Sequence, residues 1–156
     1  MLIRSFQPSD APALAALFHA SVRHGAQSFY SPQQLAAWSP APPDPATYVQ
    51  RGVEDRVFLV AIDEQGAPIA YGDVAANGYV DHLYCRPDRI GTGVASALYD
   101  SLERAAIERG IGVLSTDASE AARPLFARKG FVVEVRQEVV LGAVAIHNYR
   151  MTKCLV

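Results

Sequence analysis

The chain has 156 residues, half of them apolar and 19% charged, with a formal net charge of -2. This size fits one domain over residues 1–156 and allows a sizeable buried core. A weakly acidic chain argues against nucleic-acid binding, and no apolar run reaches the roughly 20 residues that span a bilayer. We find no signal-peptide pattern at the start, and Cys85 and Cys154 lie far apart. We therefore expect a cytoplasmic protein with two free thiols, no metal site and no membrane or nucleic-acid partner.

The first third of the sequence predicts a short strand followed by helices. The strand covers Leu2 to Phe6, and Pro8-Ser9-Asp10 opens a helix. Its apolar residues recur at helical spacing at Leu14, Leu17, Phe18 and Val22. Ser31-Pro32-Gln33-Gln34 has the pattern of a capping box, so a second helix should begin there and end near Trp38, before three prolines. Asp44-Pro45 starts a third, short helix.

Three strands follow. Arg56 to Asp63 is nearly all apolar, as expected of a strand covered on both faces. The runs Ile69 to Ala76 and Tyr79 to Arg86 flank Asn77-Gly78, a dipeptide that favours a tight hairpin turn because both residues accept positive φ.

The second half predicts a helix over Gly93 to Arg109, a strand over Ile111 to Thr116 and a helix over Ser119 to Arg128. A last hairpin comprises Phe131 to Leu141 and Val144 to Lys153, around Gly142. The resulting fold class is mixed α/β: a largely antiparallel central sheet of about six to seven strands with helices on both faces.

The most informative stretch for chemistry lies between the third of these strands and the long helix. It runs from Leu83 to Leu98 and contains a tight loop with Gly91 and Gly93. Such a loop directs backbone N–H groups and a helix N-terminus at one point, which favours a bound phosphate, and Arg86 and Arg89 add positive charge. An ordinary loop with two turn glycines is the alternative. The Gly-Lys-Ser/Thr ending of a P-loop and the three-glycine dinucleotide fingerprint are both missing.

On this stretch the sequence resembles the GNAT superfamily of N-acetyltransferases. The family pattern Gln/Arg-x-x-Gly-x-Gly/Ala falls on residues 90–95, with Ile90 in place of the leading polar residue and Arg89 beside it. A second family pattern, Asn-x-x-Ala-x-x-x-Tyr-x-x-x-Gly-Phe, falls on Ser119, Ala122, Phe126, Gly130 and Phe131. The segments 30–40, 81–84 and 148–151 resemble one bacterial branch of the superfamily.

The resemblance implies that the chain binds acetyl-coenzyme A as cosubstrate. The pantetheine arm would pair with the backbone of Leu83, Tyr84 and Cys85, and Ser119 would bond a pantetheine amide. Loop and helix residues would hold the pyrophosphate: Arg89, Ile90, Gly91, Thr92, Gly93, Val94, Ala95 and Ser96, with Lys129 nearby. Phe126 takes the place of the tyrosine that often protonates the leaving thiolate, so that role is vacant or filled elsewhere, and plain core packing is the alternative for Phe126.

The resemblance also implies direct attack of a primary amine on the thioester in a ternary complex. Asp81 is the first candidate for the general base, because it shares a strand face with Leu83 and should be half-buried in the cleft. His82, on the opposite face, is the second candidate, and Tyr149 is a candidate acid. Each has a structural alternative: a hydrogen-bonding residue, a packing histidine and a packing tyrosine, respectively.

Tyr30 and Trp38 should line the acceptor side, with core packing as the alternative, and Asp73 is a weaker candidate for the same cleft. His24 and His147 fall in no motif. We expect an N-acetyltransferase acting on a small molecule or peptide amine, with a homodimer left open. The rivals are a non-catalytic acyl-coenzyme A sensor, which Phe126 keeps open, and a domain that binds another phosphate ligand.

Overall fold

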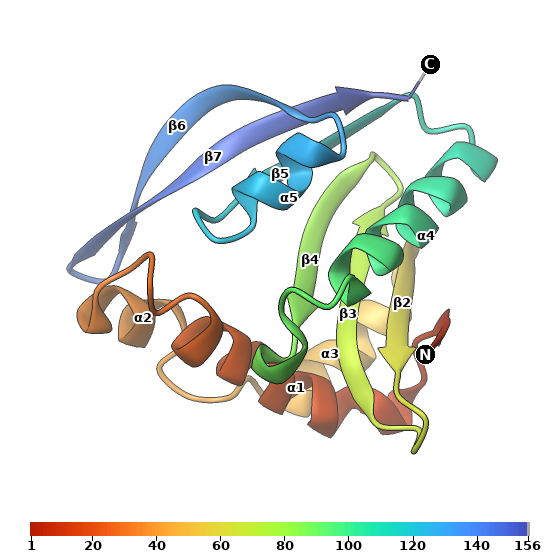
Figure 1. The fold of residues 1–156 in the computed structure, drawn as a ribbon, viewed down its shortest axis with the longest axis horizontal. Coiled ribbons are helices and arrows are strands. Elements are labelled where there is room, and N and C mark those ends of the chain that lie inside the picture. Colours follow the sequence, from red (N-terminus) through yellow and green to blue (C-terminus); the bar gives the residue numbers. More distant parts are fainter. Residues whose placement is uncertain (156) are drawn as a thin grey trace.

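The computed structural model describes residues 1–155, which form a seven-stranded sheet with helices on both faces (Figure 1). The strand order is β1-β2-β3-β4-β5-β7-β6, and every neighbouring pair is antiparallel except β4 and β5. The strands are β1 (Leu2–Ser5), β2 (Arg56–Ile62), β3 (Pro68–Ala75), β4 (Tyr79–Cys85), β5 (Val113–Ala118), β6 (Val132–Leu141) and β7 (Val144–Cys154). The mixed, largely antiparallel sheet predicted from the sequence is confirmed.

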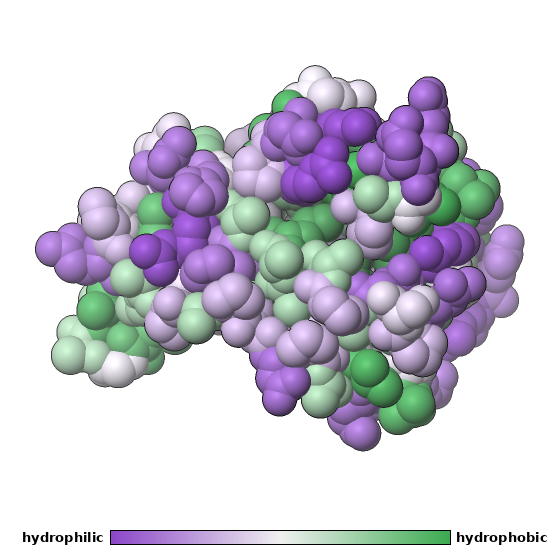
Figure 2. All heavy atoms as spheres, turned by 90° about the horizontal axis from the view of Figure 1, so that it is seen from below, coloured by the Kyte–Doolittle hydropathy of each residue, from purple (hydrophilic) through white to green (hydrophobic). Residues whose placement is uncertain are grey.

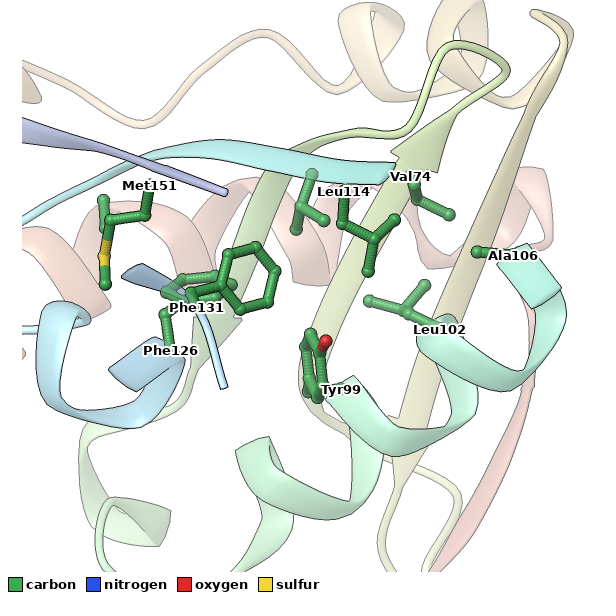
Figure 3. Close-up of a cluster of buried hydrophobic side chains, with 10 residues drawn as sticks. Val74, Tyr99, Leu102, Ala106, Leu114, Phe126, Phe131 and Met151 are labelled. Atoms are coloured by element: carbon green, nitrogen blue, oxygen red, sulfur yellow. The ribbon is translucent and has the colours of Figure 1, made fainter. Parts of the chain in front are cut away.

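The helices divide between the two faces of the sheet. The helices are α1 (Ala11–Ala20), α2 (Pro32–Trp38), α3 (Pro45–Gly52), α4 (Val94–Glu108) and α5 (Arg123–Arg128). One face packs α1 and α3 on Phe58, Val60 and Tyr71. The other face packs α4 and α5 against a cluster that includes Tyr99, Phe126 and Phe131 (Figure 3). No helix in residues 1–155 is long and apolar enough to cross a membrane.

Local signals in the sequence account for most of these boundaries. Ser31 Oγ accepts from the backbone N–H of Gln34, whose side chain accepts from the Ser31 N–H, so the predicted capping box opens α2. The Pro8–Asp10 segment is a short 3₁₀ turn capped by Gln7, and α1 begins only at Ala11. The predicted helix over Ser119 to Arg128 is too long, because α5 begins at Arg123 and the residues before it form turns.

The sheet is interrupted between β4 and β5. These two strands pair in parallel only at Tyr79 with Ser115 and at Val80 with Thr116. Beyond these pairs the strands separate, so the rest of β4 has no strand neighbour on that side. The opening is held at one end by the turn between β3 and β4, where the N–H of Ser115 donates to the carbonyl of Gly78 at 3.0 Å.

A first prediction concerns Gly78, which has a φ of +91° and whose added Cβ would lie 2.1 Å from the Val113 carbonyl oxygen. Gly78→Ala should lower the free energy of unfolding by about 3 kcal/mol, because strain in φ adds to a clash with the backbone of β5. Gly66 is the matched control: its φ is +82°, but no atom lies within 4 Å of an added Cβ. Gly66→Ala should cost only about 1 kcal/mol in urea unfolding. Equal losses in the two variants would contradict this account of the β4–β5 junction.

Candidate functional site

One large cavity of about 670 Å³ lies at the opening between β4 and β5. Its walls come from the segment after α1, from α2, from β4 and the loop before α4, from the segment after β5 and from the β6–β7 hairpin. Hydrophobic surface gathers in the middle of the face seen in Figure 2, with hydrophilic side chains around it. The cavity therefore joins a glycine-rich loop to a mixed aromatic and polar region.

The glycine-rich loop forms one end of the cavity. Gly91 and Gly93 have positive φ, and an added Cβ at either position would meet no atom within 4 Å. Gly93 is the N-cap of α4 and has no side chain to accept from the first amides of that helix. This end of the cavity therefore presents unsatisfied backbone donors and the positive end of a helix dipole, which favour an anion.

Most of the predicted coenzyme residues line this part of the cavity. They are Leu83, Tyr84, Cys85, Arg89, Ile90, Gly91, Gly93, Ala95, Ser96, Ser119 and Phe126. Three others do not line it: Thr92, the buried Val94 and Lys129, whose ammonium pairs with Asp100 at 2.7 Å. Burial raises the pKa of the Cys85 thiol to about 11, so this side chain is a neutral wall residue.

Phe126 lines the cavity and also belongs to the core. Only 2% of its surface is exposed, and its ring contacts those of Tyr99 and Phe131 edge to face (Figure 3). Its core packing, offered from the sequence as the alternative, is therefore present. Tyr149, the candidate acid, does not line the cavity and lies under the guanidinium of Arg123, 4.8 Å from the ring centroid.

Asp81 lines the cavity, as predicted, but its setting differs from the half-buried one expected. The residue is exposed, and its carboxylate accepts from Arg51 of α3 at 2.9 Å. The sequence alone could not reveal this partner, because Arg51 is 30 residues away on a separate helix.

The same arginine also binds Asp73, a fully buried carboxylate on β3. Asp73 accepts from Arg56 at 2.8 Å and from the backbone N–H of His82 at 2.9 Å. It lies at a bulge in the β3–β4 pairing, where it faces both Asp81 and His82. Asp73 does not line the cavity, so its predicted role in that cleft is wrong, and it stabilises the bulge instead.

His82 lies on the other face of β4, as the strand alternation predicts. Its Nδ1 is 2.9 Å from the Tyr71 hydroxyl, and Tyr71 in turn bonds Tyr48 at 2.9 Å. Burial, and then the charge of Arg51, lower the pKa of His82 to about 4, so the ring is neutral near pH 7. His82 does not line the cavity.

The far end of the cavity is aromatic and polar. Tyr30 and Trp38, both predicted on this side, line it with their rings 5.7 Å apart. The Tyr30 hydroxyl donates to the carbonyl of His147 at 3.0 Å and accepts from the N–H of Glu120 at 2.7 Å. His147, which falls in no motif, lines the cavity, and its Nε2 lies 2.7 Å from a carboxylate oxygen of Glu120.

A family model described as an acetyltransferase (GNAT) domain matches residues 26–153. The Escherichia coli (strain K12) protein described as the uncharacterized N-acetyltransferase YafP is 33% identical over 149 residues, covering 96% of this chain and 93% of that protein.

Solved structures agree with this match. The crystal structure of a GCN5-related N-acetyltransferase from Rhodopseudomonas palustris, also described as a class-II aminotransferase, is 34% identical. It covers 99% of this chain and 95% of its own, with a TM-score of 0.89. YncA of Salmonella typhimurium, solved with acetyl-CoA, has a TM-score of 0.78, covers 100% of this chain and 94% of its own, and at 20% identity is similar in fold.

A second prediction compares the two carboxylates that share Arg51. Asp73→Asn should lower the free energy of unfolding by about 3–5 kcal/mol, because it leaves Arg51 and Arg56 with too little buried counter-charge. Asp81→Asn removes the exposed partner and should cost less than about 1 kcal/mol. Urea unfolding at pH 7 measures both values. A larger loss in Asp81→Asn would mean that the ion pair at the cavity, and not the buried one, holds the bulge.

Proposed function

Because this chain belongs to the GNAT acetyltransferase family, we propose that it transfers the acetyl group of acetyl-CoA to a primary amine of a small molecule or peptide. The amine attacks the thioester directly while both substrates are bound. The observation that carries this proposal is that one continuous cavity joins an anion-binding helix start to a separate polar and aromatic end. Two substrates that enter from opposite ends would meet where β4 and β5 separate.

The coenzyme end fits a pyrophosphate. Gly91 and Gly93 leave open space for close approach of the backbone, and the first amides of α4 have no acceptor inside the helix. The guanidinium of Arg89 lies 4.0 Å from Asp63, so it is only loosely paired and adds positive charge at the loop. The relative from Salmonella typhimurium that was solved with acetyl-CoA shares this fold.

The pantetheine arm fits the open edge of β4. From Asp81 to Cys85 this strand has no neighbour on the β5 side, so its backbone groups there are available to an extended ligand. Leu83, Tyr84 and Cys85 line the cavity from this edge, and Ser119 lines it from the segment after β5. An arm bound in this way takes the place of the missing strand pairing.

The acceptor end suits a group that carries positive charge. Asp81 and Asp117 both line the cavity, as do the rings of Tyr30 and Trp38. Carboxylates attract an ammonium, and aromatic faces add cation–π attraction. Asp81 stays one candidate for the base, although Arg51 already neutralises much of its charge.

Protonation of the leaving thiolate does not depend on Phe126. An alkyl thiol has a pKa of about 8.5, so its thiolate leaves readily near neutral pH without a strong acid beside it. Tyr149 is a weak candidate for this role, since the neighbouring carboxylate of Glu120, together with desolvation, raises the pKa of its hydroxyl. We propose that the proton reaches the sulfur from the attacking nitrogen or from water.

A third prediction tests coenzyme binding. Gly93→Asp should weaken the affinity for acetyl-CoA by at least about 100-fold, because an added carboxylate about 4 Å from the pyrophosphate costs about 4 kcal/mol of repulsion. Gly110→Asp is the matched control: Gly110 has a φ of +79°, open space for a Cβ and a place at the other end of α4. Calorimetry should show wild-type affinity for this control. Unchanged affinity in folded Gly93→Asp would remove the loop from the coenzyme site.

The fourth prediction tests catalysis. With saturating acetyl-CoA and a panel of primary amines, the release of free coenzyme A thiol should depend on the amine and saturate with its concentration. Mass spectrometry should find the amine 42 Da heavier, the mass that an acetyl group adds. Tight binding of acetyl-CoA without any amine-dependent release would favour the acyl-CoA sensor over the enzyme.

A further inference from the structure

His147 and Glu120 form a hydrogen-bonded pair at the acceptor end of the cavity. His147 lies on β7 and Glu120 in the segment between β5 and α5, 27 residues earlier in the chain. The two side chains are partly exposed, at 18% and 22%. We propose that His147, oriented by Glu120, is the base that takes the proton from the acceptor amine. This inference rests on the proposed acetyl transfer.

The pair fixes the tautomer of the imidazole. Arg123, at 2.8 Å, and then His147 hold the pKa of Glu120 down to about 2, so this carboxylate is ionised and can only accept hydrogen bonds. Nε2 of His147, 2.7 Å away, must therefore carry the proton. The other nitrogen, Nδ1, is left with its lone pair and has no hydrogen-bond partner among residues 1–155. A lone pair on a neutral imidazole is what a general base near pH 7 requires.

The other titratable groups of the cavity are less suited to this role. Asp81 is engaged by Arg51 at 2.9 Å. Asp117 accepts from the Tyr79 hydroxyl at 2.6 Å and from Gln137 at 3.0 Å, and Arg150 lies 3.5 Å away. Burial raises the pKa of the tyrosines that line the cavity, Tyr30, Tyr79 and Tyr84. Their hydroxyls lose a proton only at high pH, so they stay protonated and cannot act as the base. Among these groups His147 alone offers a ring nitrogen, Nδ1, that no residue in 1–155 engages by a hydrogen bond.

Charged groups of both signs surround the imidazole of His147. Glu120 supplies a negative charge in direct contact, and Glu138 faces His147 across the β6–β7 pairing. Tyr30 and Tyr149 place neutral rings 5.5 Å and 5.7 Å from the imidazole. Two positive groups oppose the imidazolium from nearby: Arg123, which is paired with Glu120, and Arg136, which is paired with Glu138.

Acetyl transfer at this site involves two proton transfers, formation of a C–N bond and cleavage of the C–S bond. The acceptor arrives as an ammonium, and one of its protons passes to Nδ1 of His147, which gives an imidazolium opposite Glu120. The freed lone pair forms a C–N bond with the thioester carbon, and the C–S bond breaks. The nitrogen loses a second proton, which ends on the coenzyme sulfur as the thiol. His147 then releases its proton to water, and the products are the acetylated amine and free coenzyme A.

Tyr30 and Glu120 are positioning residues in this scheme. The Tyr30 hydroxyl binds the backbone of both partners, the carbonyl of His147 and the N–H of Glu120. This single hydroxyl fixes the segment before α2 against β7 and against the segment before α5. The pair thus keeps its geometry while the cavity beside it is open.

The test uses His147→Gln, in which the side-chain amide can still donate to Glu120 but has no basic nitrogen. The rate of amine-dependent thiol release at pH 7 should fall by roughly 100-fold, the usual scale for losing a general base, while calorimetry shows unchanged affinity for acetyl-CoA. The part of the acid limb that is independent of the amine's own ionisation should disappear from the pH–rate profile, and only the rise that follows deprotonation of the amine should remain. His24→Gln, at an exposed histidine outside the cavity, should match the wild type.

Glu120→Gln separates the charge of the carboxylate from its hydrogen bond. The amide oxygen still accepts from Nε2, but an imidazolium at position 147 would lose the negative charge that faces it. The acid limb should therefore move to lower pH, with a smaller loss of rate than in His147→Gln. A purely structural pair would lower the melting temperature and leave the acid limb in place, and that result would overturn the proposal. So would loss of the acid limb in Asp81→Asn but not in His147→Gln.

A second measurement does not depend on turnover. Imidazole ¹⁵N NMR of the free protein at pH 7 to 8 should find His147 as the Nε2–H tautomer. An Nδ1–H tautomer would overturn the proposal even if acetyl transfer is established. Conversely, absence of acetyl-CoA binding or of any amine-dependent turnover would contradict the proposed function, and the NMR result would still report on the pair.

Discussion

The early separation of β4 from β5 is the constraint on which the rest of this structure depends. Parallel strands normally continue their ladder, but here only two residue pairs form. The backbone groups beyond them must find other partners, since unsatisfied polar groups cost free energy when they are buried. On the β3 side of β4 this demand is met inside the protein, because Asp73 binds the His82 N–H at the bulge between β3 and β4. The remainder faces the cavity, where an extended ligand can satisfy it.

Sequence reasoning succeeds where the physical signal is local. The Ser31 capping box and the glycine loop before α4 each depend on residues within a few positions, and each forms as predicted. A turn also joins β3 to β4 as predicted, but only Gly78 has positive φ there, and the turn includes Ala76 because β3 ends at Ala75. Sequence reasoning fails where a role depends on a distant partner. Asp73 acquires its partner from Arg51, 22 residues earlier on a helix that packs on one face of the sheet. The role that we propose for His147 likewise depends on Glu120, and no motif joins the two.

The two ends of the cavity also differ in how their charges are managed. At the coenzyme end, Gly91 and Gly93 leave backbone donors free, and the charge that favours an anion is the helix dipole. At the acceptor end nearly every charged side chain is already paired, Asp81 with Arg51 and Asp117 with Tyr79 and Gln137. Paired carboxylates still attract an ammonium, but they have little tendency to take its proton.

This pairing explains why a base outside the family motifs is chemically reasonable here. An amine bound as an ammonium must lose a proton before it can attack, and the acceptor of that proton needs both an unoccupied lone pair and stabilisation of its charged form. Asp81 lacks stabilisation of its protonated form, because taking up a proton would break its ion pair with Arg51. His147 has the unoccupied lone pair, on Nδ1, because its tautomer places the proton on Nε2, and the carboxylate of Glu120 supplies the stabilisation. A carboxylate orients and stabilises a catalytic histidine in the same way in other enzymes. The position that Phe126 leaves without a hydroxyl then matters less, because the step that most needs help is removal of a proton and not its delivery to the sulfur.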